Sequence, residues 1–222
     1  MTRYKVWDLP LRAFHWSLVL LVLLQWGTAQ WEWLDMQWHA RFGYALLALL
    51  GFRLLWGFVG SDSARFANFL RGPRAVLAHA RTALQRRPED AAGHNPLGGW
   101  SVVALLACLL VQAVSGLYTS DEILAQGPLV ARAGSDWVDF MGDVHEINKN
   151  VLLGLIGLHL AAIAWHALGK REELVSAMFS GRRRLPRDPG LRFAGVGRAL
   201  VLLVVCAGLV VALVYWAQGQ RW

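Results

Sequence analysis

Five long apolar runs constrain this chain more than any other feature of its sequence. They lie near residues 12–30, 39–59, 97–118, 145–169 and 197–217. Each is close to the roughly 20 residues that an α-helix needs to cross a bilayer. The chain of 222 residues is also 56% hydrophobic, which is more than ordinary soluble domains contain. The sequence therefore predicts an all-α integral membrane protein with five spanning helices.

Basic residues are distributed unequally among the segments that join these runs. Residues 1–12 contain three Lys and Arg residues, and residues 53–95 and 170–192 contain seven each, whereas the two other connections contain only Arg132. Lys and Arg favour the cytoplasmic side of a membrane. The alternation predicts a cytoplasmic N-terminus and a C-terminus on the outer side. Since the net charge of +7 is explained by cytoplasmic loops, we expect no nucleic-acid partner.

The second and fourth connections contain short sequence patterns that predict local structure. After Gly72, "PRAVLAHARTAL" has a helical period and predicts a helix on the membrane surface, with a solvated connector as the alternative. For His79 on this segment and His94 in "GHNPLGG" we expect ordinary solvated or capping roles. In "GRRRLPRDPG" the prolines and charges predict a linker.

Five histidines lie on or beside the apolar runs, where an ionisable side chain is by default a sign of function. His15 lies near the inner end of the first run, His39 at the outer start of the second, and His145, His159 and His166 on the fourth. His145 and His159 would be roughly 21 Å apart along a helix and differ by about 40° in direction. We therefore expect two separate centres at two depths rather than one metal ion.

Depth suggests how these histidines are paired. His39 and His145 both lie on the outer side, and His15 lies on the inner side, toward which His159 and His166 point. His159 and His166 are seven residues apart and share a helix face, so spacing leaves either one open as the inner partner.

Haem with two axial histidines is the cofactor that fits pairs of this kind. Zinc would require three or four ligands at one depth, and a proton relay would require carboxylates between the histidines. Gly43 follows His39 by one turn, and Gly154 and Gly157 precede His159, so that a flat macrocycle could approach the backbone. Tight helix packing through small residues is the alternative.

Four stretches together resemble the bacterial cytochrome b561 family, and more narrowly its b-type cytochrome subunits of nickel–iron hydrogenases. They are "VWDLPLRAFHW", "WHARFGYALLALLGFRLLWGFVGS", "HNPLGGWSVVALL" and "VHEINKNVLLGLIGLHLAAIAWH", and the resemblance covers about residues 4–181. It implies a four-helix transmembrane bundle in the bacterial inner membrane that holds two b haems. Such a protein carries electrons between the quinone pool and a redox partner. In a bacterial inner membrane the outer side, where we expect the C-terminus, is the periplasm.

By motif, the resemblance pairs His15 with His159 on the inner haem and His39 with His145 on the outer haem. It leaves His166 as a neighbour of a haem propionate or a quinone. The four-helix pattern does not explain the fifth run, which could contact a partner subunit, support an oligomer or only set the topology. We therefore divide the chain into a dihaem domain (1–181), a charged linker (182–194) and an additional helix (195–222).

Cationic or polar residues near the histidines are candidates to hold the haem propionates. Arg53 follows His39 by 14 residues at the inner level, and the outer candidates lie within one turn of His39 or His145; these are Arg41, Asn148 and Lys149. Snorkelling to the interface or an ordinary interfacial position is the alternative for each.

The acidic outer connection could dock a basic periplasmic cytochrome through complementary charge, or it could reflect only the exclusion of basic residues from that side.

Taken together, the sequence and the resemblance predict a dihaem cytochrome that exchanges electrons with quinone and with a periplasmic c-type cytochrome or hydrogenase-like enzyme. The alternatives are a membrane anchor or assembly subunit with structural histidines, and a small transporter or proton carrier. We find no nucleophile–base pair and no phosphate-binding loop.

Overall fold

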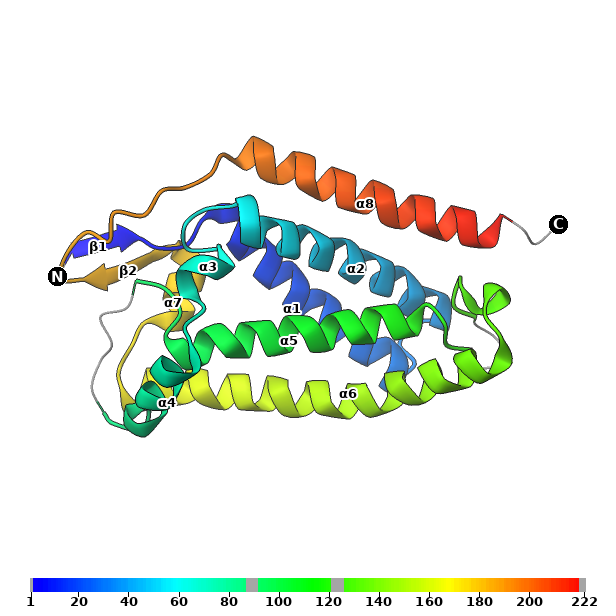
Figure 1. The fold of residues 1–222 in the computed structure, drawn as a ribbon, viewed down its shortest axis with the longest axis horizontal. Coiled ribbons are helices and arrows are strands. Elements are labelled where there is room, and N and C mark those ends of the chain that lie inside the picture. The colour runs from blue at the N-terminus through cyan, green and yellow to red at the C-terminus, as the bar shows by residue number, and fades with distance from the viewer. Residues whose placement is uncertain (1, 87–91, 121–125, 220–222) are drawn as a thin grey trace. The chain divides into compact units, whose positions relative to one another are not determined.

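The fold is dominated by five long helices in a computed structural model of the chain, which describes residues 2–86, 92–120 and 126–219. These helices are α1 (Leu9–Gln30), α2 (Met36–Val59), α5 (Pro96–Gly116), α6 (Ser135–Ala164) and α8 (Val196–Gln218) (Figure 1). All five are long and apolar enough to cross a membrane. The prediction of an all-α integral membrane protein with five spans is confirmed.

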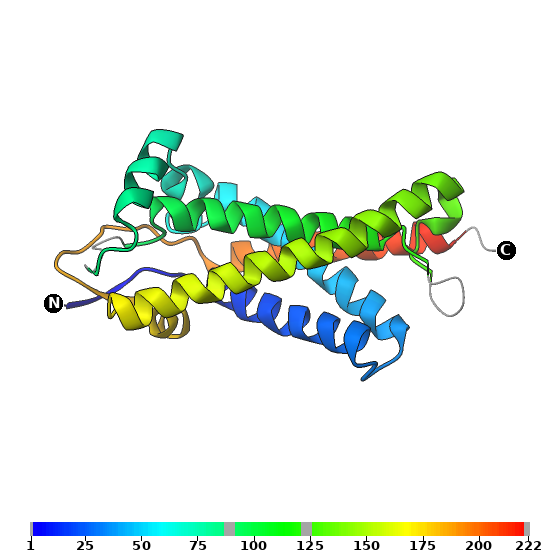
Figure 2. The ribbon, with the colours of Figure 1, turned by 90° about the horizontal axis from the view of Figure 1, so that it is seen from below.

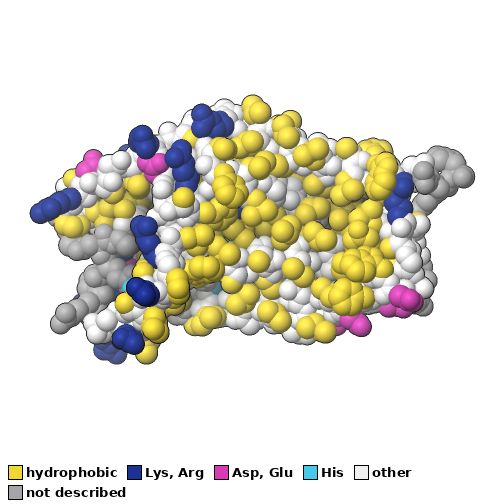
Figure 3. Space-filling model, in the orientation of Figure 1, with side chains coloured by type: hydrophobic (Ala, Val, Ile, Leu, Met, Phe, Trp, Pro, Cys, Tyr) yellow, Lys and Arg dark blue, Asp and Glu magenta, His cyan; other side chains and the backbone are white. Residues whose placement is uncertain are grey.

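The outward surfaces of these helices are apolar. Large side chains such as Leu23 on α1, Phe58 on α2 and Val204 on α8 are 60%, 70% and 69% exposed, and hydrophobic side chains cover the helices in the space-filling view (Figure 3). A soluble monomer rarely exposes continuous apolar surface of this extent. Lipid tails would cover it, while the helical backbone satisfies its own hydrogen bonds.

Shorter elements join the long helices. They are β1 (Thr2–Lys5), α3 (Phe66–Phe69), α4 (Pro73–Thr82), the 3₁₀ turn η1 (Val130–Arg132), the π-helical turn η2 (Trp165–Gly169), α7 (Leu174–Ser180) and β2 (Arg182–Leu185). α4 confirms the helix predicted after Gly72. Its location on the membrane surface stays a prediction, with Leu77 on its exposed side at 57%.

The linker predicted at 182–194 begins with a strand. β2 pairs antiparallel with β1, with Thr2 opposite Leu185 and Lys5 opposite Arg182. Gly181, at a φ of 74°, begins the return, and its carbonyl accepts hydrogen bonds from the amides of Val6 and Trp7. The two strands are about 180 residues apart in the sequence, so no local sequence pattern predicts their pairing.

Helix α6 begins ten residues earlier than the sequence predicted. It starts at Ser135 rather than near His145, and Figure 2 shows it as one long rod. Asp136, Asp139 and Asp143 lower the hydropathy of this part, but they do not interrupt a helix. Asp121 and Glu122, the other acidic residues of the predicted outer connection, lie outside the described residues.

The chain forms two compact units. The first consists of residues 1–13, 54–105 and 154–199, and the second of residues 14–53, 106–153 and 200–222. Each of the five long helices contributes a part to both. The first unit also contains the β1–β2 pair, α3, α4 and α7, and the second contains η1.

In the first unit, Asp8 connects the start of α1 to the end of α2. One carboxylate oxygen accepts from the amide of Leu11 at 2.6 Å and the other from the indole nitrogen of Trp56 at 3.1 Å. Asp8 is 1% exposed and Trp56 is fully buried. A buried carboxylate is tolerated because it caps the helix and both oxygens are hydrogen-bonded.

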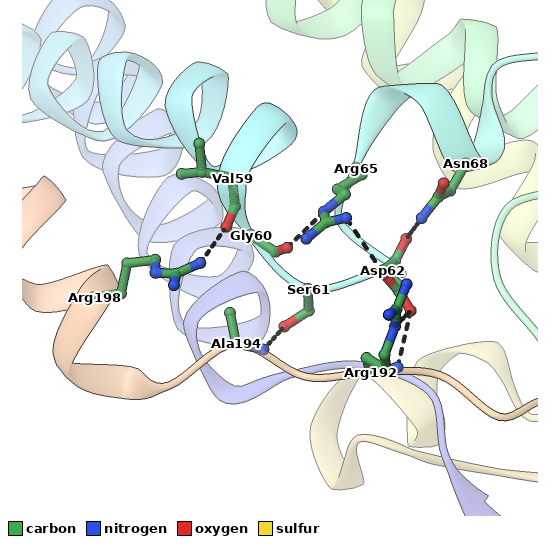
Figure 4. A network of polar contacts seen from close by, with 9 residues as sticks. All are labelled: Val59, Gly60, Ser61, Asp62, Arg65, Asn68, Arg192, Ala194 and Arg198. Carbon is green, nitrogen blue, oxygen red and sulfur yellow. Dashed lines mark hydrogen bonds and ion pairs between the residues drawn. The ribbon is translucent and has the colours of Figure 1, made fainter.

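The segment that leads into α8 is bonded to the loop after α2 in the same unit (Figure 4). Asp62 accepts from the amide and the guanidinium of Arg192 at 2.9 and 3.5 Å. The amide of Ala194 donates to the Ser61 hydroxyl at 2.9 Å, and Arg198 donates to the Val59 carbonyl at 3.1 Å. These bonds connect the beginning of α8 to the end of α2 and to the loop that follows it.

In the second unit, Arg132 of η1 holds the other end of α8. Its guanidinium donates to the carbonyls of Trp216 and Ala217 and lies 3.8 Å from the Trp216 ring. These carbonyls belong to the last helical turn, which lacks intrahelical donors. Near the middle of α8, a Cβ at position 51 of α2 would lie 3.4 Å from the sulfur of Cys206. The fifth helix therefore packs against α2.

Candidate functional site

His39 and His145 lie in the same unit. His39 is in the first turn of α2 and His145 is in the part of α6 that belongs to the second unit, and both are partly buried. The two histidines of the predicted outer pair therefore lie in one unit. Their pairing on one haem stays a prediction.

The bonds around His39 determine which of its nitrogens carries hydrogen. Nδ1 lies 3.2 Å from the Gln25 carbonyl oxygen and 3.1 Å from the Thr28 hydroxyl. The Thr28 hydroxyl itself lies 2.8 Å from the Leu24 carbonyl, to which it donates. Since a carbonyl oxygen can only accept, Nδ1 is the donor. The neutral ring then has its lone pair on Nε2.

His145 is held in the same way by a different helix. Its Nδ1 lies 3.0 Å from the Ser115 hydroxyl of α5, and that hydroxyl donates to the Gln112 carbonyl at 3.2 Å. With this hydrogen used within α5, the oxygen accepts from Nδ1. The imidazole also has a hydrogen bond with the Gln112 backbone, whose carbonyl can only accept. Gly116 is close as well, because a Cβ there would lie 3.1 Å from Cε1 of His145. His145 also presents the lone pair of Nε2.

Polar side chains join α5 to α6 beside His145. Gln112 donates to the His145 carbonyl at 3.1 Å and accepts from Asn148 at 2.6 Å. Asn148 also donates to the Cys108 carbonyl at 2.9 Å and accepts from the Cys108 thiol at 3.1 Å. Such interhelical hydrogen bonds favour helix association inside a membrane. Asn148, a predicted propionate partner, uses its amide in these contacts.

The other residues predicted around the outer pair have protein partners. The Arg41 guanidinium lies 4.7 Å from the Trp38 ring, and Lys149 forms a 2.6 Å ion pair with Glu146. A Cβ at Gly43 would meet the Gln25 side chain at 3.1 Å. With its nitrogen toward the imidazole, the Gln25 amide lies 2.8 Å from Nδ1 and 3.0 Å from Nε2 of His39. Roles of these residues toward a haem stay predictions.

The residues predicted for the inner site are divided between the units. His15 and Arg53 belong to the second unit, where the His15 ring is perpendicular to that of Trp16 at 5.0 Å and Arg53 is 2% exposed. His159 belongs to the first unit and is partly buried. It forms no hydrogen bond with any residue that the structure describes. The pairing of His15 with His159 stays a prediction.

The glycines before His159 have open space around them. A Cβ at Gly154 or at Gly157 would have no atom within 4 Å, among the described parts of the chain. The alternative considered for them, tight packing of a neighbouring helix, is not found within the described residues of the first unit. The open space is compatible with a bulky group near His159.

His166 lies in the π-helical turn at the end of α6. Its Nδ1 is 3.3 Å from a carboxylate oxygen of Glu172, and Arg183 of β2 donates to the same oxygen at 2.7 Å. Glu172 and Arg183 are both buried. These contacts connect His166 to the strand after the α6–α7 segment, and the choice between His159 and His166 stays a prediction.

His94 differs from its predicted solvated or capping role. Its ring lies between those of Trp7 and Phe69, with centroid distances of 4.9 and 4.8 Å. The cap of α5 is instead Asn95, which accepts from the Gly98 amide at 2.7 Å. His94 is a packed aromatic residue because β1 and α3, both remote in the sequence, place rings on either side of it.

Comparison with known proteins identifies the family. The model for the prokaryotic cytochrome b561 family matches residues 6–181. The chain belongs to this family. It is therefore a transmembrane b-type cytochrome that acts in electron transfer. Comparison with curated proteins and with solved structures gives no match. β2 and α8 lie beyond the matched residues.

Haem b, the group held by the cytochrome b561 family, fits the donors at the outer pair. An axial ligand must be a neutral imidazole with a free ring nitrogen, and His39 and His145 each present Nε2. The Gln25 amide beside His39 would have to move when iron binds there. Bound haem would supply one-electron exchange between the ferric and ferrous states of its iron.

The residues that orient His39 and His145 were not predicted from the sequence. These residues are Gln25, Thr28, Gln112 and Ser115. A signal was present, because each is a polar residue inside an apolar run, where such residues are costly. The sequence does not show which neighbouring helix each one faces.

Proposed function

We propose that this cytochrome b561 family member holds two b haems and transfers electrons between membrane quinone and a redox partner on the periplasmic side. His39 and His145 hold the outer haem, and His15 and His159 hold the inner one. The observation that carries the proposal is the bonding of His39 and His145, in which Nδ1 of each imidazole faces an acceptor and Nε2 is left for iron.

The protein contributes to haem binding and electron transfer in three ways. Hydrogen bonds at Nδ1 orient the ligand rings, apolar helices exclude water, and polar groups balance the charge of the propionates. Buried Arg53 is the proposed partner of the inner propionates, and the proposed outer partners are Arg41 and Lys149. Asn148 would have to release its bond to Cys108 or to Gln112 before it could donate to a propionate. Burial and these charges tune the reduction potentials. His166 is proposed as a neighbour of a propionate or of the quinone.

The partner on the periplasmic side is proposed from the charge of the outer part of α6. Asp136, Asp139 and Asp143 are exposed, and their spacing of three and four residues places them on one helix face. This acidic face complements a basic c-type cytochrome or a basic patch on a hydrogenase-like enzyme. Complementary charge raises the rate of association more than the affinity.

The test is optical spectroscopy of the purified full-length protein. We expect a reduced-minus-oxidised difference spectrum of b-type haem and about two haems per chain by pyridine haemochrome analysis. Addition of a quinol should reduce the bound haem. A protein that is purified intact from haem-replete cells without a b-type band would contradict the proposal and favour a membrane anchor with structural histidines.

A further inference from the structure

We propose that Ser115 and Thr28 are positioning residues, which fix the tautomer and the ring orientation of the two outer haem ligands. This inference rests on the proposed bis-histidine function of His39 and His145. Both hydroxyl-bearing residues lie inside membrane-spanning helices and are almost completely buried, Ser115 being 1% exposed and Thr28 2%. Polar groups at such positions are costly unless they are hydrogen-bonded.

Each hydroxyl uses its hydrogen within its own helix. Thr28 donates to the Leu24 carbonyl at 2.8 Å, and Ser115 donates to the Gln112 carbonyl at 3.2 Å. A hydroxyl has one hydrogen and two acceptor lone pairs. The intrahelical bond therefore leaves the oxygen as an acceptor, and the group that lies against it is Nδ1 of a histidine.

Both bonds to histidine connect different helices. Thr28 of α1 accepts from His39 of α2 at 3.1 Å, and Ser115 of α5 accepts from His145 of α6 at 3.0 Å. A neighbouring helix thus determines the orientation of each ring. Since Nδ1 carries the hydrogen, Nε2 is left for iron, as is usual for a ligand whose other nitrogen donates to a protein acceptor.

Each ligand has a second acceptor besides the hydroxyl. Nδ1 of His39 also lies 3.2 Å from the Gln25 carbonyl, and the imidazole of His145 also has a hydrogen bond with the Gln112 backbone. Each ring would therefore keep one acceptor when its hydroxyl is removed. We expect loss of either hydroxyl to loosen the orientation of its ring.

The helix turn that carries Ser115 also holds the backbone of His145. Gln112, one turn before Ser115, donates to the His145 carbonyl at 3.1 Å, and Asn148 donates back to Gln112 at 2.6 Å. On the other side, Gly116 allows the imidazole to approach the α5 backbone. Backbone and ring of His145 are therefore both placed by a single turn of α5, residues 112–116.

An acceptor at Nδ1 makes an imidazole more basic and so stabilises ferric iron. We therefore expect Ser115→Ala to raise the midpoint potential of the outer haem and to shift the electron paramagnetic resonance signal of its ferric form. Haem retention at this site should fall about tenfold or more. Thr28→Val should shift the potential of the same haem in the same direction, because His39, like His145, would lose one of its two acceptors.

The experiment is a redox titration and a resonance spectrum of the full-length holoprotein and its variants. Ser115→Thr and Thr28→Ser keep the hydroxyl and should restore the wild-type potential and spectrum. Ser101→Ala, a serine replacement elsewhere on α5, should change neither haem. If Ser115→Ala does not accumulate in the membrane, Ser115→Cys keeps the volume with a weaker acceptor and should shift the potential in the same direction.

Two failures can be distinguished. If the wild-type protein contains no b haem, the proposed function is wrong. If it contains two haems, but Ser115→Ala or Ser115→Cys leaves the outer potential and resonance signal unchanged, the positioning role is wrong and the function stands. An equal shift of both haems would also contradict the inference, since it would indicate a general loss of packing.

Discussion

At the scale of residues, the important question is which nitrogen each histidine presents. A histidine in a membrane helix is costly, and its role depends on the bonds around it. His39 and His145 donate from Nδ1 to acceptors on neighbouring helices, which leaves Nε2 available. His94, in contrast, is packed between two aromatic rings. Residue type alone does not separate these roles.

Replacement of single histidines tests the proposed ligands. We expect His145→Ala to reduce the haem content from about two per chain to one by loss of the outer haem, and His159→Ala to do the same by loss of the inner haem. Each loss follows from removal of one axial ligand. Pyridine haemochrome analysis and redox titration would show which haem remains.

His79→Ala is the matched control, because His79 lies on α4 outside the long helices. It should retain both haems. The pairing would be wrong if His166→Ala emptied the inner site while His159→Ala left it filled.

Gly116 tests the close approach of α5 to His145. A Cβ at this position would lie 3.1 Å from Cε1 of His145, so Gly116→Ala must displace the ring by a few tenths of an ångström. We expect partial loss of the outer haem and a destabilisation of about 1–3 kcal/mol, as for other overpacked sites. Haem content and thermal unfolding in detergent would measure both effects.

Gly142→Ala serves as the comparison. No described atom lies within 4 Å of a Cβ at that position on α6, so haem content and stability should stay near wild type. Equal behaviour of the two variants would show that the ring of His145 is not constrained by Gly116.

At the scale of elements, the fifth helix, α8, is hydrogen-bonded at both ends to other parts of the same chain. Within the first unit, bonds from Arg192, Ala194 and Arg198 hold its beginning to the loop after α2. Within the second unit, Arg132 caps its end. The sequence left open a contact with a partner subunit, and the face of α8 that packs against α2 is not free for one.

The attachment at Asp62 should depend on pH. The hydrogen bond from the backbone amide of Arg192, together with the nearby charges of Arg192 and Arg65, lowers the pKa of Asp62 below its ordinary value of 3.8. A carboxylate with a lowered pKa stabilises the fold above its unfolded-state pKa. That contribution is lost as the pH falls through the lower, folded-state pKa.

We expect Asp62→Asn to lower the melting temperature by roughly 2 °C at pH 7, because surface ion pairs contribute little. The difference between variant and wild type should shrink as the pH falls below 3.8 and should disappear once the pH is below the folded-state pKa. Thermal unfolding in detergent across this pH range would measure it. A difference that persists unchanged in acid would mean that the charge of Asp62 is not what holds the segment.

At the scale of the whole molecule, the distribution of charge predicts the orientation in the membrane. Basic residues concentrate in the N-terminal segment and in the second and fourth connections, which favours a cytoplasmic N-terminus. Five spans then place the C-terminus in the periplasm. In this predicted orientation the acidic start of α6 would face the periplasm.

Reporter fusions test this orientation. A reporter after Trp222, which lies outside the described residues, should be active only as a periplasmic fusion, such as alkaline phosphatase. A reporter before Thr2 should be active only as a cytoplasmic one. Cytoplasmic activity at both ends would contradict the five-span topology and would remove α8 from the membrane.

The sequence by itself determined the features that depend on local composition. Length and apolarity of the runs predicted the five spans, charge predicted the loop asymmetry, and motifs around His15, His39, His145 and His159 indicated the family. These signals are local because the bilayer acts on each segment as a solvent. The start of α6 at Ser135 was missed because acidic residues lower hydropathy without ending a helix.

Only the tertiary structure decided which distant residues meet. The pairing of β1 with β2, the packing of α8 on α2, and the hydroxyls of Thr28 and Ser115 against the outer histidines all join separate segments. A helical period specifies which residues share a face, but it does not specify which neighbour that face contacts. For that reason the histidines could be recognised in the sequence, whereas the residues that orient them could not.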